Sequence, residues 1–289
     1  KSIFQLYMKI YDCFMFFDEE MILDLRLNIL NEYVDKFVIT EATYLHSGKP
    51  KKLFFDINKF PKFKDKIIYN VVENQPPNLE EIYEGEDDKT GRRGEKLINN
   101  SSKREHYQRE MAQGSIEKAD PDDLILINDV DEIPNLEGLN FNKIKEKLII
   151  FKQKMFFYKF NLVHENLYWY GSRVCKKKYF ITPQWLRDTK HKKYPFWRLD
   201  TIFSKMKYRS IHYVKNGGWH FTNIKSPEDI EKKLLNYTHH HEFEESGLKL
   251  KDLKKKVEEK KAIYDHNVDS RAYKWASKTT LSAIELSEM

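Results

Sequence analysis

The sequence predicts an α/β fold in which the strands are covered on both faces. Strand-like and helix-like patterns alternate through the first half of the 289 residues, and the run LILI at 124–127 is apolar at every position, which is typical of a strand buried on both sides. With 40% hydrophobic and 14% aromatic residues, the chain can bury a large core. We therefore expect one large domain, or a domain with a substantial appendage.

The first half supplies its elements in order. Residues 8–17 have the pattern of a strand, and the acidic run 18–20 then opens a helix, because carboxylates suit the positive N-terminal end of a helix. That helix is apolar almost all round, so we expect it to be deeply buried. Residues 37–40 and 67–72 are further strands, and the polar stretch 80–102 is expected to be a mobile loop.

A helix over residues 102–119 is expected to lead into the apolar strand. On it, Glu105 and Arg109 are four residues apart and share an edge with Ala112 and Ile116. Charged side chains beside a buried face are unusual unless they pair with each other or with a ligand. The pattern therefore allows either a structural ion pair or a phosphate contact.

The strand at 124–127 is followed by three carboxylates, Asp129, Asp131 and Glu132, and then by Pro134. The carboxyl end of a strand in an open α/β sheet is where ligands bind. Two aspartates one residue apart offer oxygen ligands to a hard divalent cation such as Mg²⁺ or Mn²⁺, which can hold a diphosphate. The alternative is an acidic loop that only caps the next element.

The second half begins with an aromatic strand over residues 155–162, and residues 176–207 mix basic and aromatic side chains. The segment GGWHF follows at 217–221, where two glycines allow a tight turn or a close approach of the backbone to a ligand. Trp219 is a candidate for stacking on a sugar. His220 is a candidate ligand of metal or phosphate, or else a hydrogen-bonded core residue.

Two helices are expected near the end of the chain. Ser226, Pro227 and the two acids after them form a strong helix start. Beyond that helix, residues 239–242 (HHHE) are either a solvated polar turn or a source of a base or metal ligand. Residues 250–264 have the spacing of an amphipathic helix whose outer face is a run of Lys and Glu.

Composition narrows the functional classes. The net charge of +6 is small for a chain with 51 Lys and Arg, so it is no signature of nucleic-acid binding, and a basic pocket for an anionic nucleotide explains it equally well. Cys13 and Cys175 are expected to be free thiols, since two cysteines form neither a disulfide framework nor a zinc site. The apolar N-terminus is interrupted by Lys9 and Asp12, so no membrane span is expected in this chain.

Taken together, these segments resemble glycosyltransferase family 17, the bisecting β-1,4-N-acetylglucosaminyltransferases and their microbial and viral relatives. The segments that carry the resemblance occur in the same order along nearly the whole chain. They are YDCFMFFDEEMILDLRLNIL, FVITEATYLHSGKPKKLFF, the pattern RE-xx-QR at Arg104, Glu105, Gln108 and Arg109, DDLILINDVDEIP, Trp169-Tyr170-Gly171, GGWHF, and the stretch from Lys233 to Glu242. The departures are Tyr44 and Leu45 before His46, and the extra histidines around His240.

The resemblance implies a GT-A-like nucleotide-sugar transferase fold with a mixed central sheet and helices on both faces. Residues 1–289 would form one catalytic domain, with a nucleotide-binding half at 1–134 and an acceptor-side half with the C-terminal helices at 135–289. The implied reaction is an inverting, metal-dependent transfer of N-acetylglucosamine from UDP-N-acetylglucosamine to a glycan or polysaccharide. No nucleic-acid partner is implied, and the oligomeric state stays unknown.

The resemblance and the residue chemistry together assign candidate roles around the donor. Asp129 and Asp131 would hold Mn²⁺ or Mg²⁺ against the diphosphate, with His220 as the third protein ligand and His240 as the second choice. The other donor-binding candidates are Glu41 for ribose or uracil, Arg109 and Arg104 for phosphate, and Trp219 for the sugar.

Inversion requires a carboxylate that takes the proton of the acceptor hydroxyl. Glu242 is the first candidate for this base, because it matches the H-x-E of the family. Glu132, Asp188 and Asp200 compete with it.

Two alternatives belong to other classes: a metal-dependent phosphohydrolase that uses the DVDE carboxylates, and a non-catalytic module that binds glycans or nucleic acid through the basic and aromatic residues of 176–207. The many Lys, Ile, Asn and Phe residues suggest a microbial or viral source and hence a cytoplasmic location. A Golgi lumen location is the alternative if an N-terminal anchor was removed.

Overall fold

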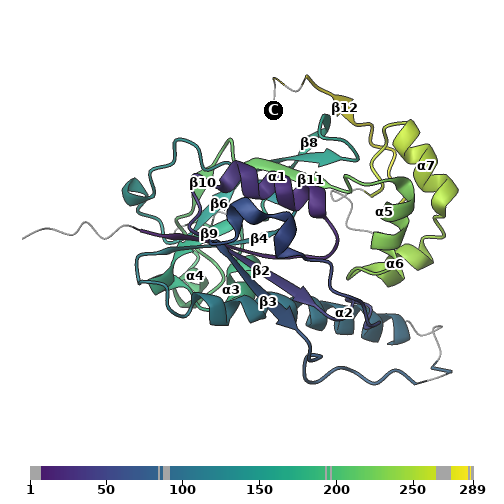
Figure 1. The fold of residues 1–289 in the computed structure, drawn as a ribbon, viewed down its shortest axis with the longest axis horizontal. Helices are drawn as coiled ribbons and strands as arrows, with labels where there is room; N and C mark the ends of the chain where they lie inside the picture. The colour runs from purple at the N-terminus through teal and green to yellow at the C-terminus, as the bar shows by residue number, and fades with distance from the viewer. Residues whose placement is uncertain are drawn as a thin grey trace, which may run out of the picture.

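The computed structural model describes residues 8–83, 85–86, 92–192, 194–195, 197–264, 275–285 and 287. They form an α/β fold with two mixed sheets (Figure 1). The seven-stranded sheet has the order β10-β6-β9-β4-β1-β2-β3, and β9 runs antiparallel to both of its neighbours. Its strands are β1 (Ile10–Met15), β2 (Lys36–Ala42), β3 (Ile67–Val72), β4 (Leu124–Asp129), β6 (Ile149–Phe151), β9 (Arg173–Lys176) and β10 (His212–Val214).

The five-stranded sheet has the order β12-β8-β7-β11-β5. Its strands are β5 (Glu132–Pro134), β7 (Gln153–Phe157), β8 (Leu162–Trp169), β11 (Gly218–Thr222) and β12 (Ser282–Ala283). The helices are α1 (Glu20–Leu30), α2 (Arg92–Glu110), α3 (Pro183–Asp188), α4 (Asp200–Phe203), α5 (Pro227–Leu234), α6 (His240–Glu245) and α7 (Leu250–Glu258). Short 3₁₀ helices are η1 (Ile57–Lys59), η2 (Pro61–Phe63), η4 (Met111–Ile116), η5 (Phe141–Lys143) and η6 (Lys177–Tyr179).

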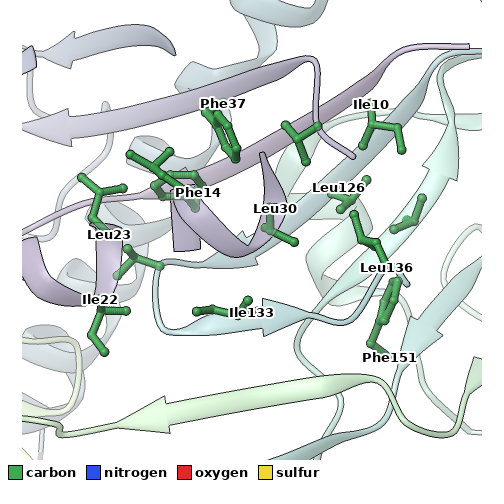
Figure 2. Packing of buried hydrophobic residues seen from close by; sticks show 14 of the residues in the cluster. Ile10, Phe14, Ile22, Leu23, Leu30, Phe37, Leu126, Ile133, Leu136 and Phe151 are labelled. Carbon is green, nitrogen blue, oxygen red and sulfur yellow. The ribbon is translucent and has the colours of Figure 1, made fainter. Parts of the chain in front are cut away.

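Helices cover both faces of the larger sheet, as the apolar run of β4 predicts. Leu124 and Leu126 pack into the cluster that contains α1, whereas Ile125 and Ile127 pack into the cluster that contains Leu186 of α3. Successive side chains of a strand point to opposite faces, so a strand between two helical layers must be apolar at every position. Figure 2 shows the first of these clusters, in which side chains of α1 lie against those of the strands.

The carboxylates of DVDE span the turn that joins the two sheets, since Asp129 is the last residue of β4. Val130 and Asp131 form the turn itself, and Glu132 already belongs to β5 of the smaller sheet, where it pairs with His220 of β11. Pro134 therefore ends β5, a strand of the smaller sheet, and not the apolar strand β4. The chain crosses from one sheet to the other at DVDE, and this crossing brings the two halves of the sequence together.

Five expected elements differ in the structure. The polar stretch 80–102 is not a loop throughout, because α2 begins at Arg92; of the rest, residues 84 and 87–91 lie outside the described part. Sequence periodicity missed the early turns of α2 because its buried positions there are small or polar, namely Gly94, Asn100 and Ser101. A Cβ at Gly94 would lie 2.5 Å from Nε2 of His241, so α2 packs closely on α6 at this point.

The C-terminal end of the expected helix over 102–119 also differs, since α2 ends at Glu110 and continues as η4. The aromatic strand expected over 155–162 is instead a hairpin of β7 and β8, and Tyr158 turns the chain with a left-handed φ of 63°. The segment 239–242 is the start of α6, and its side chains are largely buried rather than solvated. The last helix is shorter than expected, since α7 ends at Glu258.

Other expectations are confirmed. Ser226 caps α5 by accepting a hydrogen bond from the backbone N–H of Asp229, and Pro227 is the first residue of that helix. Cys13 and Cys175 are buried free thiols. Among the described residues, no helix combines the length and the apolar character needed to cross a bilayer.

A buried ion pair holds the DVDE turn against the larger sheet. Arg26 of α1 is fully buried, and its Nε and Nη2 donate to the carboxylate of Asp12 on β1 at 2.8 and 2.5 Å. Its Nη1 donates to the backbone carbonyl of Glu132 at 2.6 Å and contacts those of Asp129 and Val130 at 3.3 Å. One guanidinium therefore binds β1 and three carbonyls of the turn at the same time.

We predict that Arg26→Met lowers the free energy of unfolding by about 3–5 kcal/mol, because it leaves the carboxylate of Asp12 buried without its cation. The double variant with Asp12→Asn should recover part of this loss. Urea unfolding of the two single variants and the double variant measures the coupling. Strictly additive effects would show that the pair does not act as a unit.

Candidate active site

A cavity of about 370 Å³ lies where the carboxyl ends of β1 and β4 face the smaller sheet. Met15 and Asp129, the last residues of these two parallel strands, are paired in register and both line it. The smaller sheet contributes His220 and Thr222 of β11, and α5 contributes Lys233. The cavity therefore opens at the strand ends where the topology of an open sheet leaves room for a ligand.

Asp129 is held between two arginines. Its side chain is 33% exposed, the highest fraction among the three DVDE carboxylates. Nη2 of Arg187 donates to it at 2.6 Å, and Nη2 of Arg109 donates to it at 3.2 Å. Arg109 also binds Glu105 at 2.8 Å, so the ion pair that the helical spacing allowed does form and extends to the DVDE turn.

Glu132 is fully buried and all of its interactions are internal. Arg187 donates to it at 2.6 and 2.8 Å, Nε1 of Trp169 donates to the same carboxylate, and the backbone N–H of Asp129 donates at 2.9 Å. Burial alone would raise the pKa of Glu132, but the charge of Arg187 lowers it to about 2. The Trp-Tyr-Gly segment packs directly against the carboxylate of Glu132. A Cβ at Gly171 would lie 2.0 Å from Oε1 of Glu132, so a residue with a side chain would clash there.

Asp131 faces two further basic groups. Nε2 of His220 lies 3.5 Å from one of its oxygens, and Nζ of Lys233 lies 3.6 Å from the other. Burial would raise the pKa of Asp131, but Lys233 and His220 hold it well below its usual range, so the carboxylate is ionised at neutral pH. The ring of His220 packs on Trp169, with ring centroids 5.0 Å apart.

Asp131 and His220 suit a divalent cation. A carboxylate oxygen of Asp131 and Nε2 of His220 face one another on the cavity wall, and both are atom types that bind divalent transition metals. A cation that also bound Asp129 would have to displace Arg187 or Arg109 from its oxygens, whereas at Asp131 it would share the carboxylate with Lys233, 3.6 Å away. Within the described ranges, no three His, Cys, Asp or Glu side chains gather as a ready metal site.

The order of the motifs agrees with a comparison of the sequence against known protein families. The sequence profile of glycosyltransferase family 17 matches residues 2–266. The chain belongs to glycosyltransferase family 17. Neither the curated proteins nor the solved structures compared with it give a match. As a family 17 protein it is a transferase that acts on a sugar donor and a glycan acceptor.

The candidate donor residues of this family 17 protein do not all reach the cavity. Arg109 touches the turn through Asp129, whereas Arg104 binds the carbonyl of His46 and the side chain of Gln75. Glu41 is buried and accepts hydrogen bonds from Lys51, which lines the cavity, and from Tyr69.

Trp219 does not line the cavity, and Trp169 occupies its wall instead. The two glycines before Trp219 permit close approach to protein backbone. A Cβ at Gly218 would lie 2.2 Å from the carbonyl oxygen of Ile133, and one at Gly217 would lie 2.5 Å from the backbone nitrogen of Lys152.

The candidate catalytic bases differ in how buried they are. Glu242 is buried on α6 beside Nδ1 of His239, 3.1 Å away, and is not part of the cavity wall; its assignment as the base stays a prediction. Asp188 is exposed at the end of α3, and Asp200 is exposed and paired with Arg198 and Lys207. His240, the second choice as a metal ligand, binds the carbonyl of Tyr237 and does not line the cavity.

Among the cavity residues to which the sequence assigned no functional role are Glu19, Arg187, Asn223 and Lys233. Lys233 begins the stretch 233–242 that resembles the family, and Glu19 belongs to the acidic run 18–20 that was interpreted only as a helix start. The sequence therefore drew attention to both residues without indicating that they line a cavity. Arg187 lies in the basic and aromatic stretch 176–207, where spacing does not distinguish one cation from another.

We predict that Glu132→Gln destabilises the protein by about 3 kcal/mol at pH 7, because Arg187 loses a buried anionic partner. Because the folded-state pKa of Glu132 is about 2 against an ordinary value of 4.5, its contribution is complete above pH 4.5 and is lost as the pH falls toward 2. Urea unfolding at pH 7 and pH 3 should therefore give a smaller difference between wild type and variant at pH 3.

The matched control is Glu228→Gln, which removes an exposed carboxylate that pairs with Lys254 at 2.8 Å. An exposed ion pair contributes little to stability because water screens it, so this variant should stay close to wild type. Equal losses in the two variants would contradict the structural role of Glu132.

Proposed function

We propose that this family 17 enzyme transfers N-acetylglucosamine from UDP-N-acetylglucosamine to a glycan hydroxyl with inversion, on a GT-A-like fold and with Mn²⁺ or Mg²⁺. The observation that carries the proposal is the DVDE turn at the junction of the two sheets, whose Asp131 faces His220 at 3.5 Å across the cavity wall. The family membership supports sugar transfer, and the choice of N-acetylglucosamine follows from the resemblance to bisecting transferases.

Asp131 and His220 would hold the cation, and Asp129 would join them by exchanging an arginine for the metal. When bound, the cation would act as a Lewis acid that neutralises charge on the departing UDP. This chain supplies fixed positive charges beside it. Lys233 stays protonated because Asp131 and Glu19 raise its pKa although burial alone would lower it, and Arg187 adds a guanidinium on the opposite side of the turn.

These cations would also orient the donor. Lysine and arginine form charge-assisted hydrogen bonds to phosphate oxygens, and such bonds are stronger in a partly buried cavity than in water. The indole of Trp169 stands on the same wall and offers an apolar face beside His220. The donor sugar would then lie between the DVDE turn and the smaller sheet, with its anomeric carbon open to the acceptor.

The decisive experiment is a donor screen with UDP-N-acetylglucosamine, UDP-galactose, UDP-glucose and GDP-mannose at fixed Mn²⁺. Release of nucleotide is measured with and without a panel of acceptor glycosides. We expect UDP-N-acetylglucosamine to react fastest and the rate to rise with acceptor. Hydrolysis of simple phosphate esters, with no reaction of any nucleotide sugar, would favour a phosphohydrolase instead.

We further predict that Asp131→Asn lowers the transfer rate by at least about 100-fold and weakens the binding of Mn²⁺ alone, measured by calorimetry. The control is Asp122→Asn, an exposed carboxylate that pairs with Lys176 and Lys178 far from the cavity, and it should change neither quantity. Unaltered Mn²⁺ affinity in Asp131→Asn would overturn the assigned metal site.

A further inference from the structure

A second cavity of about 280 Å³ adjoins the first and shares four lining residues with it, Glu19, Asp131, Asn223 and Lys233. It lies between the start of α1, the end of β11 and one side of α5. Its volume is near the lower end of the range for small-molecule sites, about 300–1,000 Å³. The two cavities therefore meet along one shared wall beside the DVDE turn.

Asn223 is the unusual residue of this wall. It is 3% exposed, and its Nδ2 has no hydrogen-bond partner among the described residues. Its backbone is left-handed, with a φ of 55°, a conformation that asparagine adopts more readily than most residues other than glycine. A buried donor without a partner reduces stability, and a bound ligand that accepts its hydrogen bond would remove that cost.

Glu19 stands on the same wall, at the point where the two cavities meet. Its Oε1 lies 3.5 Å from Nζ of Lys233 and 3.8 Å from Nζ of Lys225, and its Oε2 accepts the backbone N–H of Asp18 at 3.2 Å. Burial would raise the pKa of Glu19, but the two lysines lower it, so the carboxylate is ionised and able to accept a proton. Glu242 lines neither cavity.

The remaining surface of the second cavity suits a sugar ring. Ile22, Phe221 and Ile224 offer apolar contacts for C–H groups, and Asp18 and Lys225 offer polar contacts for hydroxyls. A polyhydroxylated ring presents both kinds of group. A nucleotide phosphate would instead meet the carboxylates of Asp18 and Glu19.

We propose that the second cavity is the acceptor subsite: it binds one sugar ring of the acceptor glycan, Asn223 donates a hydrogen bond to it, and Glu19 is the catalytic base. This inference rests on the proposed transfer reaction. The acceptor O–H bond breaks and its proton moves to the Glu19 carboxylate, while the acceptor oxygen forms a bond to the anomeric carbon. The bond from that carbon to the diphosphate breaks, and its electron pair leaves with UDP.

The test for Asn223 is the variant Asn223→Gly, which removes the amide but keeps a residue suited to the left-handed backbone. Binding of methyl glycosides of glucose, galactose, mannose and N-acetylglucosamine to the UDP- and Mn²⁺-loaded protein is measured by saturation-transfer NMR. We expect the wild type to bind at least one of them and the variant to bind it about tenfold more weakly. UDP affinity and thermal stability should not fall.

The matched control is Asn78→Gly, since Asn78 is exposed and also left-handed, with a φ of 62°. It should change no affinity. Absence of glycoside binding to the loaded wild type, or equal losses of UDP and glycoside affinity in Asn223→Gly, would overturn the acceptor subsite. Absence of UDP binding by the wild type would instead contradict the proposed function itself.

The test for Glu19 is Glu19→Gln compared with Glu242→Gln. We expect Glu19→Gln to lower kcat for transfer by at least about 100-fold and to remove the fall of kcat at acidic pH, with UDP affinity retained. Glu242→Gln should keep that pH dependence. The opposite pattern, with transfer intact in Glu19→Gln and lost in Glu242→Gln, would overturn the assignment of the base.

Discussion

The buried guanidinium of Arg26 is the interaction on which the site depends. It binds Asp12 of β1 on one side and the carbonyls of the DVDE turn on the other, so α1, the central strands and the turn are tied together at one point. Buried backbone carbonyls require a hydrogen-bond donor, and the guanidinium of Arg26 supplies one to the carbonyls of Asp129, Val130 and Glu132. Arg26 thus holds the backbone of the turn in place whether or not a ligand binds to its carboxylates.

The carboxylates of DVDE form ion pairs with basic side chains from other segments of the chain. Arg187 of α3 binds Asp129 and Glu132, and Lys233 of α5 faces Asp131. Helices from the second half of the chain therefore complete a turn that belongs to the first half. The divided roles follow from this arrangement: Glu132 is buried and structural, whereas Asp131 stays on the cavity wall.

Crossing from one sheet to the other at DVDE also explains why two cavities meet there. β1 and β4 end on one side, β11 passes on the other, and α5 packs beside both. A transferase must hold a donor and an acceptor within bonding distance, and a shared wall between adjoining cavities is a direct way to do so. Glu19, Asn223 and Lys233 stand on that wall.

The sequence by itself determined the class of fold, the strands β1 to β4, the cap of α5, the family, and the position of the carboxylates after β4. Those features are local, because periodicity, capping and motif order can be followed along the chain. The tertiary structure alone decided which charges meet. The partners of the turn are Arg26, Arg187 and Lys233, each more than 50 residues from the turn in sequence, and no spacing rule connects them to it. It also decided which basic groups meet each aspartate, Arg187 and Arg109 at Asp129 and His220 and Lys233 at Asp131, because burial and ion pairing depend on what packs around each carboxylate.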